Sequence, residues 1–483
     1  MLTMQSLRRI FLVVGLLLVL VFGPVIFAGY TDLSFVSLAP SAHDQSIYYE
    51  SAARRLPWAL DLYQAAGSAA LDANEYGRAI MLFQTARQKS ALTPIGQFQL
   101  GKAWLLNGDQ DQALAEWQGL LNGQAPAAVS ASPYLADIYH AQARFDDEER
   151  VLRQWLALDP KNADVHYRLG LLLFADAAPE AIPLLEFAAA VSPQLEPAAD
   201  GLRSALKTAL ASPSAADSLT YCGQTLAAIN EWPLALRAFS RAVDADANNA
   251  LTWAWLGETR QQTPLIPPIF GVQNGGMRGG SALDALQRAV TLAPDSAQIR
   301  AMFGLYWQRQ RDWQKALAEF EAAARLEPQN AIWQVSLGDV TVRAGNLVTA
   351  LTYYQNAASL GPKDPQTWRA LALFSVENDV DIDGIGREAA LQAYALEPEN
   401  AHNMDILGRA LTATGQYDAA EVLFKKALAA APRAASPAFH LALLYLQTDK
   451  ADLAKQYLQS AQALDPDGPI GAQAARILTR YFP

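Results

Sequence analysis

The residues that could carry metal-binding or thiol chemistry are few and widely separated. The single cysteine, Cys222, excludes an intramolecular disulfide and a zinc site built on several cysteines. The five histidines have neither a second histidine at helical spacing nor an acidic cluster beside them. They are His43, His140, His166, His402 and His440. We therefore expect no metal site, and we expect Cys222 to be a small buried core residue.

Two other signatures of chemistry are incomplete. Gly275-Gly276 and Gly279-Gly280 form a glycine-rich stretch, but no Gly-Lys-Ser/Thr follows to complete a phosphate-binding loop. No Gly-x-Ser-x-Gly sequence is present to place a nucleophilic serine. We therefore expect no catalytic site and no cofactor, and we expect that the chain is not an enzyme.

The composition indicates a packed protein that does not bind nucleic acid. Of the 483 residues, 51% are hydrophobic and 18% are charged, which is too apolar for a disordered chain. The net charge is −11 and there is no long basic run, whereas nucleic-acid binding needs clustered Lys and Arg.

The N-terminal segment has the length and composition of a membrane anchor. Residues 10–28 carry no charge over 19 positions, enough for a helix to cross a bilayer. Arg8 and Arg9 precede this stretch, and no Lys or Arg follows until Arg54. The positive-inside rule then predicts a single-pass anchor over 1–29, with the N-terminus inside and the remainder outside the cytoplasmic membrane. A signal peptide cleaved after Ala28 is the alternative. Residues 30–47 are polar without a helical period, and we expect a linker there.

The rest of the chain repeats with a regular period. Pro294, Pro328 and Pro362 are 34 residues apart, as are Pro398, Pro432 and Pro466. Small and large residues recur in the same register. The repeat that begins at residue 401, for example, has Gly408 at its eighth position, Ala420 at the twentieth and Phe424 at the twenty-fourth. A proline at position 32 cannot continue a helix, so it ends the second helix of each repeat.

This pattern resembles the tetratricopeptide-repeat (TPR) family, whose 34-residue units are pairs of helices. The resemblance implies an all-α fold, a right-handed TPR superhelix (an α-solenoid), here with an N-terminal transmembrane helix. The array is expected over 48–468, with eleven full units starting at residues 60, 94, 129, 163, 216, 250, 297, 331, 365, 401 and 435. Residues 48–57 fit the second helix of a further unit.

Three segments depart from the repeat. Residues 196–215 predict one extra helix, and residues 469–483 predict a terminal capping helix. An insertion at 261–280 separates the two helices of one unit and places apolar residues on a loop, where they need a covering surface. These candidate contact residues are Leu265, Ile266, Ile269, Phe270 and Val272.

In the family, the first helix of each unit lines the concave face, through positions 2, 5, 9, 12 and 13. The resemblance therefore implies a candidate peptide-binding groove over Arg309, Asp339, Arg343, Arg369, Asp405, Arg409 and Phe439. Arg343, Arg369 and Arg409 come from consecutive units, so they could bind an acidic segment, partly neutralised by Asp339 and Asp405. The alternative is a solvated face with scattered charge.

These features predict a membrane-tethered scaffold or assembly factor of the bacterial cell envelope, with proteins or peptides as partners and contact with the membrane through the N-terminal helix. The alternative is an accessory subunit of an enzyme of envelope polysaccharide synthesis or glycosyl transfer, because TPR arrays accompany several such systems.

Overall fold

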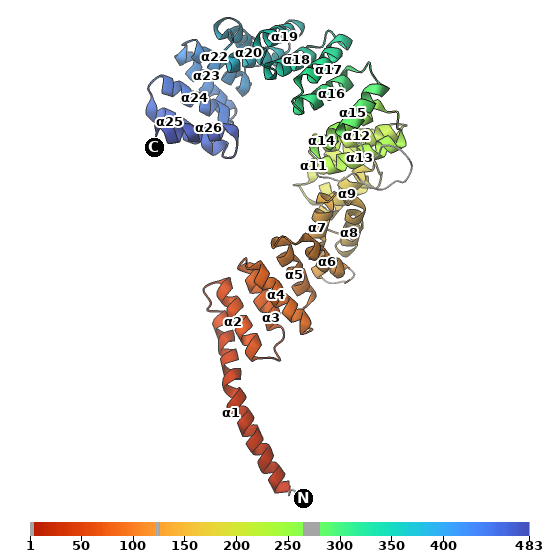
Figure 1. The fold of residues 1–483 in the computed structure, drawn as a ribbon, viewed down its shortest axis with the longest axis vertical. Helices are drawn as coiled ribbons and strands as arrows, with labels where there is room; N and C mark the ends of the chain where they lie inside the picture. The colour runs from red at the N-terminus through yellow and green to blue at the C-terminus, as the bar shows by residue number, and fades with distance from the viewer. Residues whose placement is uncertain (1–3, 122, 124–125, 264–280, 483) are drawn as a thin grey trace. The chain divides into compact units, whose positions relative to one another are not determined.

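The computed structural model describes residues 4–121, 123, 126–263 and 281–482, with side chains from Leu20 onward. Within these residues the chain is all-α: helices follow one another with short turns and no strand. They fall into two compact units, α1–α13 and α14–α26 (Figure 1). The α-solenoid expected from the repeat pattern is confirmed.

The first unit contains a long N-terminal helix, α1, followed by shorter helices that mostly pack in consecutive pairs. Its helices are α1 (Met4–Val36), α2 (Ala42–Arg55), α3 (Leu62–Asp72), α4 (Tyr76–Gln88), α5 (Pro94–Leu106), α6 (Gln110–Leu121), α7 (Pro126–Ala141), α8 (Phe145–Leu158), α9 (Ala163–Ala175), α10 (Ala181–Val191), α11 (Glu196–Leu210), α12 (Ala215–Ala228) and α13 (Trp232–Ala245).

The second unit continues the pairs and includes a short π-helical turn, η1. Its elements are α14 (Ala250–Gln262), α15 (Ala282–Leu292), α16 (Ala297–Arg309), α17 (Trp313–Leu326), α18 (Ala331–Arg343), α19 (Leu347–Leu360), α20 (Pro365–Asn378), η1 (Ile382–Gly386), α21 (Arg387–Leu396), α22 (Ala401–Ala413), α23 (Tyr417–Ala430), α24 (Ala435–Gln447), α25 (Ala451–Leu464) and α26 (Pro469–Tyr481).

Local sequence signals set the ends of the two helices of a pair, here named helix A and helix B. Helix A often starts after a capping side chain, as where Asn330 accepts a hydrogen bond from the backbone N–H of Ile332. The A-to-B turn then contains a residue with positive φ, such as Gly345 (84°) or Gly415 (78°). Glycine adopts that conformation without steric cost, so helix A stops there and helix B folds back against it.

One contact recurs inside the pairs and explains the small residue at position 8. In eight pairs this residue is a glycine of helix A, and an added Cβ would collide with the large side chain of helix B at or near position 24. The pairs in contact are Gly67 with Phe83, Gly101 with Trp117, Gly170 with Leu185, Gly223 with Phe239, Gly257 with Leu286, Gly304 with Phe320, Gly338 with Tyr354 and Gly408 with Phe424. Each buried side chain therefore fills the space that the missing Cβ leaves.

The segment after the apolar stretch differs from the predicted linker. Helix α1 runs without interruption through Pro24 to Val36, and α2 begins at Ala42. Most of the linker expected at 30–47 is therefore helical, because its side chains have packing partners that a polar composition did not suggest. Ile26 and Leu33 of α1 pack against a buried cluster that includes Leu56 and Leu62.

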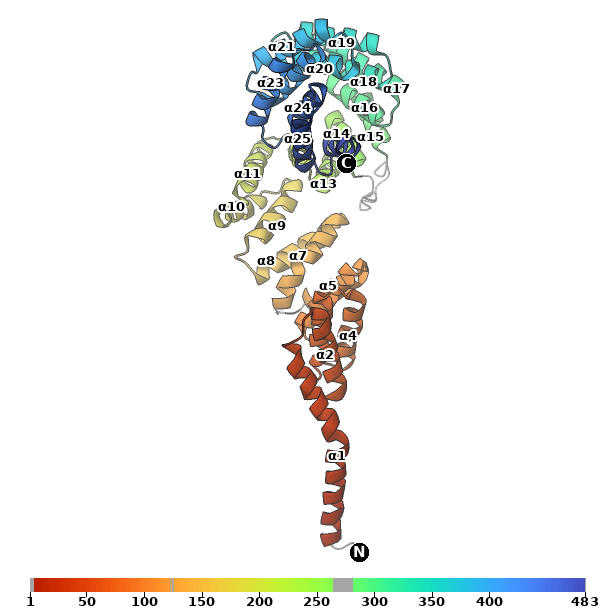
Figure 2. The same cartoon turned by 90° about the vertical axis from the view of Figure 1, so that its left-hand side faces the viewer.

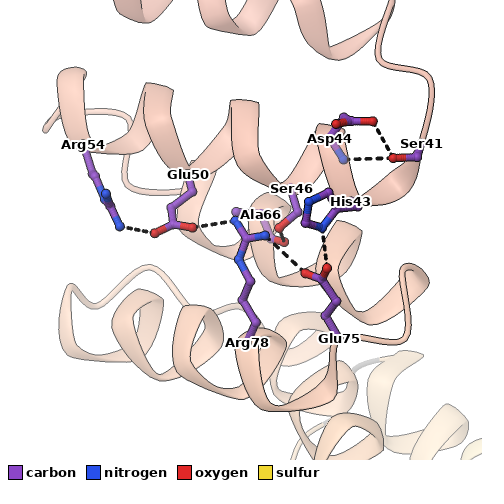
Figure 3. A network of polar contacts seen from close by, with 9 residues as sticks. All are labelled: Ser41, His43, Asp44, Ser46, Glu50, Arg54, Ala66, Glu75 and Arg78. Atoms are coloured by element: carbon purple, nitrogen blue, oxygen red, sulfur yellow. Dashed lines mark hydrogen bonds and ion pairs between the residues drawn. The ribbon is translucent and has the colours of Figure 1, made fainter.

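Polar contacts attach α2 to the first repeat (Figure 3). Ser46 donates to the backbone carbonyl of Ala66 at 2.9 Å, and Glu50 accepts from Arg78 at 2.7 Å. His43 pairs with Glu75 at the start of α4. Helix α2 is thus the second helix of a unit, as residues 48–57 suggested, and the C-terminal part of α1 acts as its first helix.

The remaining departures from the repeat are simple to place. Helix α11 occupies most of 196–215 and packs singly between the α9/α10 and α12/α13 pairs, and α26 closes the array as its last helix. The segment 264–280 lies outside the described residues. Within the described residues, no helix is long and apolar enough to span a membrane.

Adding a methyl group at the contact between helices A and B is expected to destabilise the array. The Cβ of Gly408→Ala would lie 2.6 Å from the Phe424 ring, so we expect a loss of about 1–3 kcal/mol, seen as a lower urea midpoint. Phe424→Leu in the same chain should make the added methyl less costly. If Gly408→Ala costs as much in the Phe424→Leu background as alone, the ring is not what the glycine accommodates.

Candidate functional site

The A helices from α18 to α24 form a continuous inner layer in the second unit. Helix α18 contacts α20, α20 contacts α22 and α22 contacts α24, whereas their B helices make no comparable contacts with one another in the part of the chain described. Closer spacing of the A helices places them on the concave side of the curve. The predicted groove residues on α18, α20, α22 and α24 come from this layer, and Arg309 lies on α16, the A helix that precedes it in the chain.

Two of the predicted arginines connect neighbouring parts of this layer. Arg309 makes two hydrogen bonds with the carboxylate of Glu258 on α14, at 2.6 and 2.7 Å. Arg369 donates to Asn403 on α22 at 2.7 Å and to Glu397 at 2.6 Å. A guanidinium already held by a planar carboxylate or amide has fewer donors for a ligand. These two arginines therefore stabilise the spacing between consecutive repeats.

Asp405 and Phe439 were placed in the groove by their repeat positions, but the structure buries both side chains. Asp405 accepts hydrogen bonds from Ser436 at 2.7 Å and from His440 Nδ1 at 2.9 Å, both on α24. It therefore joins α22 to α24 instead of neutralising the arginines. In a catalytic triad the aspartate binds Nδ1 of the histidine and the serine binds Nε2. Here Ser436 and Asp405 both lie on the Nδ1 side of His440, with the serine at 3.4 Å, so the three side chains do not form a triad.

The two predicted arginines without a short ion pair, Arg343 and Arg409, lie on α18 and α22. Arg343 is exposed and makes no hydrogen bond or ion pair with any described residue. Its neighbour Asp339 accepts from Tyr354 at 2.5 Å, and desolvation raises the pKa of Asp339 despite that bond and the charge of Arg343. Arg409 is partly buried, with Glu377 at 3.9 Å, a long ion pair.

The inner face also carries accessible groups that the charge-based prediction missed. Leu305 on α16 and Ile332 on α18 are exposed large hydrophobic residues at positions 9 and 2 of their units. His402 on α22 is exposed, and its pKa is lowered by desolvation and by the positive charges of Arg369 and Arg409. The repeat register already placed all three on this face, so reading apolar residues alongside charged ones would have found them.

The second set of predicted contact residues cannot be placed. Leu265, Ile266, Ile269, Phe270 and Val272 all lie outside the described residues.

A buried polar cluster in the first unit has perturbed titration behaviour, which makes it a second candidate site. His140 on α7 contacts Glu148 on α8 at 3.1 Å and Glu231 before α13 at 3.5 Å. Burial lowers the pKa of His140, but the hydrogen bonds and charges of both glutamates outweigh it and raise this pKa to about 9. Glu148 occupies a repeat position where alanine is usual, and this ion pair explains the exception.

A buried arginine extends this cluster across non-consecutive repeats. Arg237 on α13 binds Asp176 through Nε at 2.7 Å and through a terminal nitrogen at 2.9 Å, and it reaches Asp146 at 3.2 Å. Every charged group in the cluster is therefore paired across helices, which favours a structural role where α13 meets α8 and α9.

The turn at 379–384 has the spacing Asp-x-Asp-x-Asp-Gly, which was not singled out in the sequence and which occurs in calcium-binding loops. In the structure Asp381 caps the turn by accepting from the backbone N–H of Gly384 at 3.2 Å, and Asp383 lies 3.4 Å from Arg387. No group of three potential metal ligands converges anywhere in the described residues. Cys222 is fully buried, as predicted, and burial raises its pKa to about 12.

Comparison with known proteins supports the repeat assignment. Two family models described as tetratricopeptide repeat match the chain, one at residues 65–128 and 301–365 and the other at 411–478. Cellulose synthase operon protein C of Escherichia coli K12 is 25% identical over 295 residues. That similarity covers 56% of this chain but only 24% of the relative, so the chain spans about a quarter of that protein's length.

Solved structures similar to the chain share only a low level of identity with it. The yeast Tom70 structure is 16% identical and covers 95% of each chain with a TM-score of 0.41. The Cut9 and Hcn1 hetero-tetramer structure is 17% identical and covers 96% of each chain with a TM-score of 0.39. Scores this low do not establish a common overall shape.

The His140 cluster predicts a pH dependence of stability. Because the folded pKa of His140 is raised from 6.5 to about 9, its contribution is complete below pH 6.5 and is lost as the pH rises through 9. We expect the free energy of unfolding of the wild type to exceed that of His140→Gln at pH 6.5, by at most about 3 kcal/mol, and the difference to shrink by pH 10. A gap that stays constant over this range would show that His140 does not titrate in this way.

Proposed function

The chain is a tetratricopeptide-repeat protein, and from that premise we propose that it binds an extended segment of another protein on the inner face of its second unit. The observation that carries this proposal is Arg343, whose guanidinium is exposed and without a hydrogen bond or ion pair among the described residues. An arginine in that state can bind a carboxylate through two parallel hydrogen bonds.

The surroundings of Arg343 suit a peptide better than a small molecule. Ile332 on the same helix and Leu305 on the preceding A helix offer exposed apolar surface. An extended segment that places an apolar side chain on this surface and a carboxylate on Arg343 would use both properties. Arg409 offers a weaker second contact, because its ion pair with Glu377 is long.

We also propose that the N-terminal segment tethers this array to the bacterial cytoplasmic membrane, with the repeats outside. The support is the 19-residue uncharged stretch, the two arginines before it and the exposed apolar side chains that α1 carries from Leu20 to Phe27. In that position the protein would serve as a scaffold or assembly factor for envelope proteins.

A second candidate function follows from one observation, the similarity to cellulose synthase operon protein C. It favours an accessory role beside an enzyme of envelope polysaccharide synthesis. Co-purification from detergent-solubilised membranes separates the two functions: a polymerase or glycosyl-transferase partner supports the accessory role, whereas structural envelope proteins support the scaffold.

Removing the Arg343 charge is expected to weaken binding without unfolding the protein. We expect Arg343→Ala to reduce capture of acidic peptides on a peptide array by about tenfold, since a charged hydrogen bond contributes about 1.5–3 kcal/mol. Arg325→Ala, on the B helix α17, is the matched control and should bind normally.

Arg369→Ala should instead lower the melting temperature in a thermal unfolding measurement, because this arginine connects α20 to Asn403 on α22 and to Glu397. Equal peptide capture by the wild type and a folded Arg343→Ala variant would reject this site.

The topology proposal predicts that protease added to intact spheroplasts digests the repeat array, while a cytoplasmic marker in the same cells survives. Protection of the array in intact spheroplasts and its digestion after permeabilisation would place it inside and contradict the proposal. A mature N-terminus at Gly29 would instead establish the cleaved alternative.

A further inference from the structure

We propose that the turn between α2 and α3, which carries Trp58 and Leu60, lies in the interface of the phospholipid bilayer, so that the array is seated on the membrane instead of hanging from a flexible linker. This inference rests on the proposed membrane tether. It starts from the continuity of α1, which forms one helix from Met4 to Val36 and whose N-terminal half extends past α2, α3 and α4 in both views (Figures 1 and 2).

The C-terminal half of α1 is fixed to α2 by close packing. An added Cβ on Gly29 would lie 2.7 Å from Cγ of Leu56, so the two helices touch at this glycine. Asp32 forms an ion pair with Arg55, and the rings of Phe35 and Tyr48 are 5.8 Å apart. A helix held by apolar, ionic and aromatic contacts cannot swivel independently of its partner.

The order of these contacts fixes the direction of α2. Phe35 lies beside Tyr48 and Gly29 lies beside Leu56, so α2 runs antiparallel to α1. The residues after Leu56 therefore lie toward the N-terminal half of α1. Ala59 in this turn belongs to the same cluster as Ile26, which places the turn at the level where the predicted span of residues 10–28 ends.

The side chains at that level suit a lipid interface. Trp58 is 57% exposed and Leu60 is 37% exposed, and Tyr30, which follows Gly29 on α1, is also exposed. Tryptophan and tyrosine concentrate where the acyl chains meet the headgroups, because each has an apolar ring and one polar group. Leu20, in the preceding part of α1, is 65% exposed, as expected of a side chain that faces lipid.

The connection continues into the repeats. Helix α2 is attached to α3 and α4 by the contacts of Ser46, Glu50 and His43 shown in Figure 3. The orientation of the first repeats relative to the membrane is thus set by α1, and the α2–α3 turn is the part of the array closest to the lipid. Tilt of a membrane helix is set by such packing and by aromatic anchors.

Depth-dependent fluorescence quenching tests the inference on the full chain. Cys222 is buried with a pKa raised to about 12, so a new surface cysteine can be labelled selectively at neutral pH. Leu60→Cys, Leu20→Cys and Asp72→Cys would each carry a fluorophore in vesicles of phosphatidylethanolamine and phosphatidylglycerol that contain one lipid quencher near the headgroups and another in the acyl chains, since residue 20 lies near the middle of the predicted span. Asp72 is the matched control, because it lies at the far end of α3, about 16 Å along the helix axis from the end that follows Leu60.

We expect lipid-borne quencher to reduce the emission of the labels at residues 20 and 60 at least twofold more than that of the label at residue 72. Quenching at residue 20 with none at residue 60 would overturn the seated arrangement and leave the tether intact. Absence of quenching at residue 20 would reject the tether itself, and the inference with it.

Discussion

The structure depends on one steric constraint, the close approach of helices A and B at a glycine. Where Gly304 faces Phe320 or Gly408 faces Phe424, the buried ring occupies the volume of the absent Cβ. The constraint recurs from pair to pair because one pair cannot bury both of its apolar faces. Repetition of the same approach then brings successive A helices into contact on the concave side, where they form the face proposed to bind a partner.

Because of that constraint, the helix pairs could be predicted from the sequence. Small residues at positions 8 and 20, a large residue at position 24 and a proline at position 32 specify helix ends and packing within a single unit. The pairs followed from this pattern, and the single helix α11 and the last helix α26 were predicted where the chain departs from it. The pattern did not predict that most of residues 30–47 is helical. The reason is that Gly29 and Asp32 take their roles from contacts with Leu56 and Arg55, more than twenty residues away.

The candidate site was less predictable for a related reason. Repeat position places a residue on a helix face, but its neighbours in the next repeat decide whether it remains accessible. Asp405 is buried because Ser436 and His440 bind it from α24, and Arg369 is occupied because Asn403 accepts from it. Charged residues on the inner face thus mostly connect repeats, and Arg343 differs in lacking such a partner among the described residues.

Hydrogen exchange of the full chain, measured with and without the partner recovered by co-purification, tests the central claim most directly. Binding on the inner face predicts that backbone amides of the A helices α16, α18, α20 and α22 exchange more slowly in the complex, while those of the B helices α17, α19, α21 and α23 change little. Protection confined to the B helices, or to the first unit alone, would contradict the proposed binding face.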